Sequence, residues 1–122
     1  MPPLVILLVG VLGLCIGSFL NVVAYRVPLG RSVVRGRSHC PSCRATIVWY
    51  DDIPVLSWLL LRGRCRRCHA PISGWYPLGE LLTGVAFAVA AWLVPNPVVL
   101  GVVLVLVSAS VAAAGIARTR RP

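Results

Sequence analysis

The sequence predicts an all-α integral membrane protein, with about three transmembrane helices and a cysteine-bearing loop between the first and second. Composition supports this class, because 58% of the 122 residues are hydrophobic and only 12% are charged. The mean hydropathy is +0.87. A soluble domain of this length cannot bury so much apolar side chain, whereas a bilayer accommodates it. The other two observations are three long apolar runs and two Cys-x-x-Cys pairs.

Each apolar run is close to the length of about 20 residues that crosses a hydrocarbon core. A break at Pro95-Asn96-Pro97 separates the second run from the third, since proline disfavours a continuous helix. The run Ile53–Leu61 is too short to cross, and we expect it to pack at the membrane interface or against the cysteine pairs. We expect one domain over residues 1–122, with spans at about 3–25, 77–94 and 97–117, a loop over about 26–76 and a basic tail at 118–122.

The first run is interpreted as a retained span. A signal peptide has a basic segment before an apolar core of about 7–15 residues. Here the apolar run is longer, no basic residue precedes Arg26, and no small-residue cleavage site follows.

The arginines predict the orientation. All twelve basic residues are arginine, nine lying between Arg26 and Arg67 and three at the C-terminus. Three crossings place both groups on one side, and the positive-inside rule assigns that side to the cytoplasm. Tyr25, Trp75, Tyr76 and Trp92 lie near predicted span ends, as aromatic residues at a membrane interface do.

Four cysteines form the strongest motif. Cys40 and Cys43 make one pair, Cys65 and Cys68 make another, and 21 residues separate the pairs. Two such pairs supply a tetrahedral thiolate set, so zinc is the metal we expect, with iron or a redox dithiol as alternatives. Two disulfides are the other reading, which a reducing cytoplasm disfavours. A closed site of this kind is typically structural.

Other polar and small residues have simpler interpretations. His39 and His69 flank the pairs and are expected at the surface or beside the ligands, and Cys15 is expected to act as a small apolar residue. Gly13 and Gly17 predict close helix packing; with Asn21 nearby, the alternative is a polar patch that faces a substrate.

Several ordered motifs between Gly10 and Phe87 resemble the N-terminal half of the type IV prepilin peptidases. They are Gly17–Pro28, Cys40-Pro41-Ser42-Cys43, Tyr50–Trp58, Arg62–Cys68, Pro71-Ile72-Ser73 with Tyr76-Pro77-Leu78, and Glu80-Leu81-Leu82-Thr83-Gly84. The sequence departs from the family at Asp52, where asparagine is more frequent.

The resemblance implies a bacterial inner-membrane enzyme of type IV pilus and type II secretion systems. Such enzymes cleave the leader of prepilins and pseudopilins and then methylate the new N-terminus with S-adenosylmethionine. The peptidase aspartates of the family lie in the C-terminal half, one in a Gly-x-Gly-Asp motif that does not occur here. We therefore expect the N-terminal half alone, which does not cleave by itself and acts with a separate peptidase half. No glycine-rich strand–turn–helix is visible to place the S-adenosylmethionine site.

The three acidic residues are Asp51, Asp52 and Glu80. Asp51 and Asp52 are adjacent, so we expect them to cap a helix or pair with arginines rather than to form a catalytic dyad. No catalytic residue is assigned. Glu80 is expected in the first turn of a helix after Pro77, where a carboxylate meets the positive end of the helix dipole. The alternative is that it attracts the basic leader or the free amine of a pilin. Candidate substrate-binding residues are Glu80, Asn21 and Asp51.

A non-enzymatic role is the competing hypothesis. The loop, anchored in the membrane, would then bind a partner protein, an anionic lipid or nucleic acid through its arginines. Membrane topology already explains the arginines, and no groove-reading helix or aromatic stacking platform is evident, so nucleic acid is not expected.

Overall fold

The computed structural model describes residues 1–34 and 38–120. Residues 35–37 of the predicted loop and 121–122 of the predicted basic tail lie outside the described residues, and with them Arg35, Arg37 and Arg121. The described elements are the helices α1 (Pro3–Arg26), α2 (Leu56–Leu60), α3 (Trp75–Leu93) and α4 (Pro97–Arg120), and the short 3-10 helix η1 (Trp49–Asp51).

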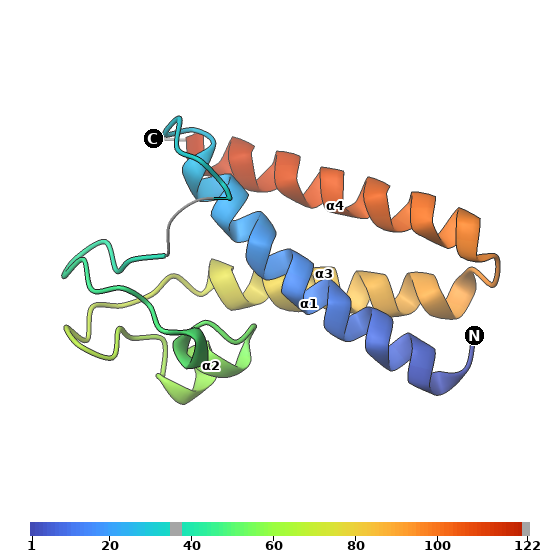
Figure 1. Ribbon diagram of the computed structural model, residues 1–122, viewed down its shortest axis with the longest axis horizontal. Coiled ribbons are helices and arrows are strands. Elements are labelled where there is room, and N and C mark those ends of the chain that lie inside the picture. The colour runs from blue at the N-terminus through green and yellow to red at the C-terminus, as the bar shows by residue number, and fades with distance from the viewer. Residues whose placement is uncertain (35–37, 121–122) are drawn as a thin grey trace.

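Three of these helices are long and apolar enough to cross a membrane: α1, α3 and the Pro97–Arg118 part of α4. They lie roughly alongside one another, with the cysteine-bearing loop projecting beyond one end of the bundle (Figure 1). The prediction of an all-α protein with three apolar helices and a cysteine cluster between the first two is therefore confirmed.

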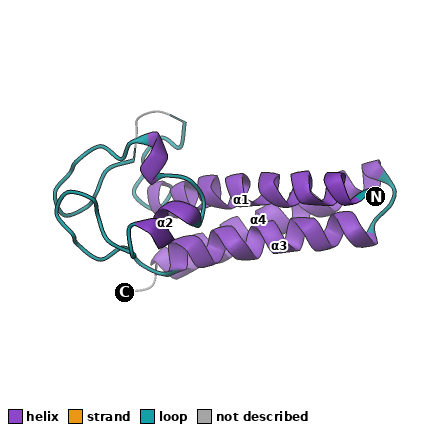
Figure 2. Cartoon of the chain, turned by 90° about the horizontal axis from the view of Figure 1, so that it is seen from below, coloured by secondary structure: helices purple, strands orange, loops and turns teal. Residues whose placement is uncertain are grey.

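The end of α1, the start of α3 and the end of α4 meet at the same end of the bundle as the loop (Figures 1 and 2). The N-terminus and the short connection from α3 to α4 lie at the opposite end. Because Arg118 and the described arginines of the loop lie at one end of the bundle, the positive charge of these residues is gathered there in space as well as in sequence.

Glycines set the close approach of α1 to α3. A Cβ added at Gly13 would lie 2.8 Å from the Cα of Gly84, and one added at Gly17 would lie 2.9 Å from the Cα of Glu80. Phe87, only 1% exposed, packs beside Gly13. This arrangement matches the helix-packing interpretation of the glycines, since small residues let backbones approach within a membrane.

The fourth helix packs more loosely. Leu100 of α4 is buried with Ala90 and Ala91 of α3, and Gly115 approaches Ala24 of α1 at the other end. Only 6% of the most apolar stretch of α4 is buried inside the protein. Most of its exposed residues are apolar, as expected of a helix that faces lipid.

Helix α3 begins earlier than the sequence indicated. It starts at Trp75, and Ser73 Oγ accepts a hydrogen bond from the Trp75 amide at 3.2 Å. Pro77 fits inside the first turn, because a helix needs no amide hydrogen bond there. Glu80 consequently lies in the second turn, and its predicted place in the first turn was wrong.

Candidate metal centre

The two cysteine pairs fold into the same tight turn. In the first, the amide of Cys40 donates to Ala45 O and the amide of Arg44 donates to Cys40 O, at 3.0 and 2.8 Å. In the second, Cys65 donates to Ala70 O and His69 donates to Cys65 O, at 2.9 and 3.0 Å. The two turns have the same shape because each Cys-x-x-Cys pair forms the same local hydrogen bonds.

Each turn also places a non-glycine residue in the left-handed region. The φ angles are 60° at Arg44 and 59° at His69, the residue that follows the second cysteine of each pair. This conformation is costly for a residue with a Cβ. It lets the chain reverse immediately after the second sulfur.

The four sulfur atoms of Cys40, Cys43, Cys65 and Cys68 all lie within 4.8 Å of one another. Across the two turns, Cys40 Sγ is 3.6 Å from Cys68 Sγ and Cys43 Sγ is 3.8 Å from Cys65 Sγ. A tetrahedral zinc site with Zn–S bonds of about 2.3 Å requires sulfur separations of about 3.8 Å. The residues therefore fit a tetrathiolate metal site, and the four cysteines are positioned to hold a metal ion.

Disulfides do not describe this arrangement. A disulfide joins its sulfurs at about 2.05 Å, and all four cysteines are free thiols in the structure. The close sulfur pairs also run between the two turns rather than within either one. Both turns must fold against each other before the set is complete.

The local electrostatics already favour thiolate. Hydrogen bonds from the backbone amides of Cys43 and Ser42 lower the pKa of Cys40 to about 6. The amides of Cys68 and Arg67 likewise lower the pKa of Cys65. At Cys68 the amide of Ala70 acts in the same direction, but burial and the neighbouring thiols outweigh it and raise the pKa to about 11. Backbone amides therefore favour the thiolate at one cysteine of each turn.

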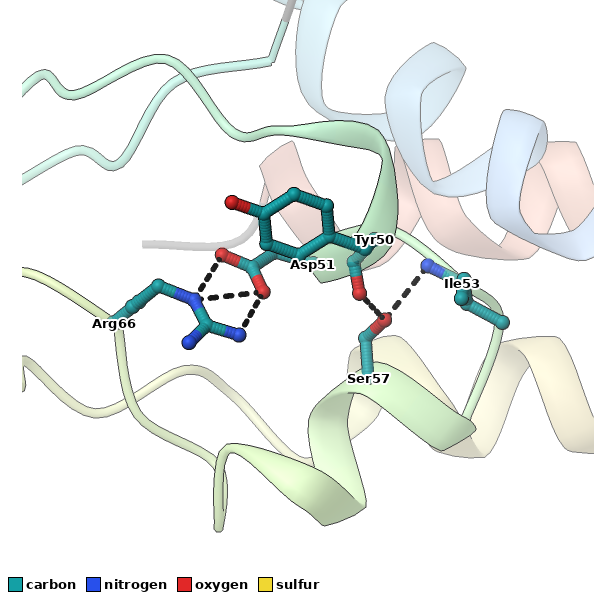
Figure 3. Close-up of polar contacts among 5 residues, drawn as sticks. All are labelled: Tyr50, Asp51, Ile53, Ser57 and Arg66. Atoms are coloured by element: carbon teal, nitrogen blue, oxygen red, sulfur yellow. Dashed lines mark hydrogen bonds and ion pairs between the residues drawn. The ribbon is translucent and has the colours of Figure 1, made fainter.

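An ion pair ties the second turn to the segment before α2 (Figure 3). Arg66 Nη2 lies 2.8 Å from Asp51 Oδ1, and Arg66 Nε donates to Asp51 Oδ2 at 2.9 Å. The guanidinium carbon also lies 5.3 Å from the centroid of the Tyr50 ring. Because Arg66 sits between two cysteines, this pair orients the turn that presents them.

Buried Ser57 holds the same segment together through two hydrogen bonds. This residue of α2 is 4% exposed; its Oγ donates to Tyr50 O and accepts from the Ile53 amide, both at 2.8 Å (Figure 3). It closes a compact unit of η1 and α2 against which Arg66 docks. The flanking Leu59 and Leu60 remain exposed, at 58% and 72%.

A second set of contacts holds α2 and the residue before it; one comes from α3 and the others lie within the loop. Glu80 Oε1 of α3 accepts a hydrogen bond from the Val55 amide at 3.1 Å, and Val55 has φ 62°, an outlier for a β-branched residue. Trp58 of α2 donates through Nε1 to Ile72 O at 3.2 Å. Its ring covers Gly63, where an added Cβ would lie 2.7 Å from Cζ2.

The three predicted substrate-binding residues all have partners within the protein. Asp51 binds Arg66, Glu80 accepts from Val55, and Asn21 Nδ2 donates to Tyr76 O at 3.0 Å. Each of these contacts joins separate segments of the chain. His39 and His69 are exposed and do not belong to the sulfur cluster.

The structural roles of Ser57 and Trp58 were not predicted, although both residues lie in the Tyr50–Trp58 motif that resembles the family. The sequence pattern does not mark Trp58 as the cover of Gly63. Nor does it mark Ser57 as buried, because a serine inside an apolar run is equally compatible with an exposed position.

Comparison with known proteins supports this description. The sequence profile of a family described as the bacterial peptidase A24 N-terminal domain matches residues 11–94. The chain belongs to this family. The match includes the four cysteines of the cluster, most of α1 and all of α3, whereas α4 lies beyond it.

Curated relatives of this peptidase A24 N-terminal chain are longer proteins. A prepilin leader peptidase/N-methyltransferase of Myxococcus xanthus is 61% identical over 85 residues, covering 70% of this chain and 25% of the relative. A type 4 prepilin-like proteins leader peptide-processing enzyme of Escherichia coli is 48% identical, covering 69% of this chain and 38% of the relative. A prepilin leader peptidase/N-methyltransferase of Klebsiella pneumoniae is 46% identical, covering 77% and 44%. The chain thus spans less than half the length of these relatives. No solved structure matches it.

Proposed function

We propose that this chain is a membrane-embedded, zinc-binding domain of prepilin-peptidase type that acts in the processing of type IV prepilins or pseudopilins. The observation that carries the proposal is the family match over residues 11–94, which contains the whole cysteine cluster. Residues 1–122 then form one domain in the bacterial cytoplasmic membrane. The cysteine loop and the C-terminus face the cytoplasm, as the arginine distribution favours.

Zinc is the metal proposed for the cysteine site. The sulfur separations suit it, and the compartment would keep the thiols reduced. Zinc would hold the two turns together, because binding energy becomes folding energy when the site forms only with the metal. Arg66 and the other loop arginines would offset the negative charge of a tetrathiolate site.

Metal content tests this assignment. The purified chain should contain one zinc per molecule by mass spectrometry of the metal. Cys43→Ser and Cys68→Ser should lose most of it, whereas Cys15→Ser, which changes a cysteine of α1 outside the cluster, should not. Equal zinc content in all three variants would refute the site.

Leader cleavage by this chain alone is not part of the proposal. An aspartic peptidase needs two carboxylates that share a proton around one water. Here Asp51 is paired with Arg66, and Glu80 is hydrogen-bonded to Val55. A separate peptidase half would supply cleavage, and this chain would organise the substrate at the membrane interface, with Glu80, Asn21 and Asp51 as candidate contacts.

Methyl transfer with S-adenosylmethionine is the second proposed activity. Its support is the name of the relatives in M. xanthus and K. pneumoniae, which includes N-methyltransferase. The zinc-loaded protein should be incubated with S-adenosylmethionine and either intact prepilin or pilin whose leader has been removed. The pilin N-terminus is then read by mass spectrometry.

We expect the leader of intact prepilin to stay uncut. Cleavage would overturn the argument from the carboxylates. One added methyl group on the pre-cleaved pilin would establish the transferase. Binding without a mass change would instead favour the non-enzymatic module, in which the loop only holds a partner.

A further inference from the structure

A pocket of about 280 Å³ opens where the three spans meet at the loop end of the bundle. Its lining comes from the end of α1, the start of α3 and the end of α4. The residues that matter for its chemistry are Asn21, Tyr25, Ser73, Trp75, Tyr76 and Arg118. This volume is at the small end of the range for ligand sites, about 300–1,000 Å³, and suits a headgroup better than a large cofactor.

Arg118 supplies the charge in this pocket. Its guanidinium carbon lies 4.1 Å from the centroid of the Trp75 ring, so the indole holds one face of the cation. Stacking on a ring leaves the N–H groups at the edge of the guanidinium available in the plane, where they bind two oxygens of an anion side by side. None of the residues that line the pocket is acidic.

Backbone amides are not the main donors here. The amides of Trp75 and Tyr76 already donate to Ser73, to Oγ and to the carbonyl oxygen, each at 3.2 Å. Asn21 Nδ2 is likewise used by Tyr76 O. The positive end of α3 adds to the field, but a ligand in the pocket would bind mainly through Arg118.

The position of the pocket indicates that the anion belongs to a lipid headgroup. Trp75, Tyr25 and Tyr76 are 54%, 40% and 40% exposed at the ends of spanning helices. Aromatic residues in such places lie at the level of the lipid headgroups. Basic pockets between spanning helices at this depth bind anionic headgroups.

We propose that the pocket between the ends of α1 and α4 and the start of α3 binds the phosphate group of an anionic phospholipid, with Arg118 as its main ligand. This site is separate from the cysteine cluster and does not depend on prepilin processing. It requires only that the three helices span a bilayer.

Native mass spectrometry of the full chain in detergent tests the proposal with phosphatidylglycerol, phosphatidylcholine and inorganic phosphate as probes. We expect one phosphatidylglycerol to bind more tightly than phosphatidylcholine. Arg118→Gln should weaken it about tenfold, as the loss of a charge-assisted hydrogen bond does. Arg31→Gln removes the same charge from an exposed position outside the pocket. It should change the affinity for phosphatidylglycerol about twofold or less, because salt screens charges that are exposed to solvent.

A neutral variant separates a built pocket from diffuse attraction. Trp75→Leu leaves the net charge unchanged but removes the surface that holds Arg118, so it should also weaken phosphatidylglycerol binding, with the helical circular dichroism retained. Equal effects of Arg118→Gln and Arg31→Gln, or unchanged binding in Trp75→Leu, would overturn the site. Displacement of the lipid by inorganic phosphate would show that the pocket binds the free anion. It would overturn the proposal that the ligand is a phospholipid.

Discussion

Arg66 and Asp51 lock the second cysteine turn onto the loop segment that precedes α2. The carboxylate side chain is only 10% exposed and the guanidinium side chain is 55% exposed. The neighbouring carboxylate, through its hydrogen bond and its charge, raises the pKa of Arg66. A residue between two metal-ligand candidates therefore carries a structural contact of its own.

Removal of this contact should loosen the loop. We expect Arg66→Ala to lower the free energy of unfolding only slightly, since the exposed guanidinium is screened by solvent. It should also weaken zinc binding severalfold, because the turn loses the partner that orients it. Chelator competition on the purified chain measures the second effect.

The matched control is the next residue. Arg67 makes no ion pair within residues 38–120, the described part of the chain around it. Arg67→Ala removes the same charge from the same turn, so its zinc affinity should stay close to that of the wild type. Equal losses in both variants would mean that net charge, not the Asp51 contact, governs the site.

Helix packing in the membrane gives a second prediction. Gly13→Ala places a methyl group 2.8 Å from the backbone of Gly84, which forces α1 and α3 apart. We expect a loss of about 1–3 kcal/mol, the usual cost of overpacking. Gly101→Ala is the control, because an added Cβ there meets nothing within 4 Å. Thermal unfolding in detergent should separate the two variants, and similar midpoints would argue against close packing at Gly13.

The spans and the sulfur cluster were predictable from sequence for physical reasons. An uncharged run as long as Pro3–Tyr25 has few stable alternatives outside a bilayer. Two residues between cysteines bring both sulfurs of a pair toward one point, whatever the rest of the loop does. The spans and the geometry of each cysteine pair depend on local chemistry, whereas the meeting of the two pairs depends on how the loop between them folds.

The contacts between distant segments of the chain were not predictable. The sequence offered many arginines for Asp51, and only the fold selects Arg66. Likewise, nothing marks Val55 as the partner of Glu80, because a β-branched residue rarely adopts a positive φ. Such pairs depend on the relative placement of distant segments, which local patterns do not encode.

Asp52 should make stability depend on pH. Partial burial raises the pKa of this carboxyl, although part of the side chain stays in solvent. The folded chain then holds the proton at a higher pH than the unfolded chain does. Protonation therefore favours folding, and stability from this group rises as pH falls through the raised pKa.

Asp52→Asn should remove that dependence. We expect the variant to be slightly more stable at neutral pH, by less than about 1 kcal/mol given the solvent exposure. The difference from the wild type should shrink as the pH falls toward the ordinary pKa of an aspartate. Denaturation curves at several pH values measure it, and a constant difference would show that the asparagine acts through shape rather than charge.

The left-handed residues of the two cysteine turns give the last prediction. A residue with a Cβ loses about 1–2 kcal/mol in this region, and His69, with φ 59°, is also exposed. His69→Gly relieves the strain, but glycine has more freedom in the unfolded chain, which offsets part of the gain. We therefore expect a net stabilisation of at most about 1 kcal/mol, seen as slower loss of metal to a chelator.

Arg67→Gly distinguishes strain relief from a general effect of glycine. Arg67 lies in the same turn and is also exposed, but it is not among the residues with positive φ. Glycine at this position relieves no strain in the folded state. It lowers the stability by about 1 kcal/mol because it gives the unfolded chain more conformational freedom. Opposite signs for the two variants would establish that the turn after Cys68 stores strain. If both variants lose metal faster than the wild type, the His69 side chain stabilises the site by more than the strain of its positive φ destabilises it.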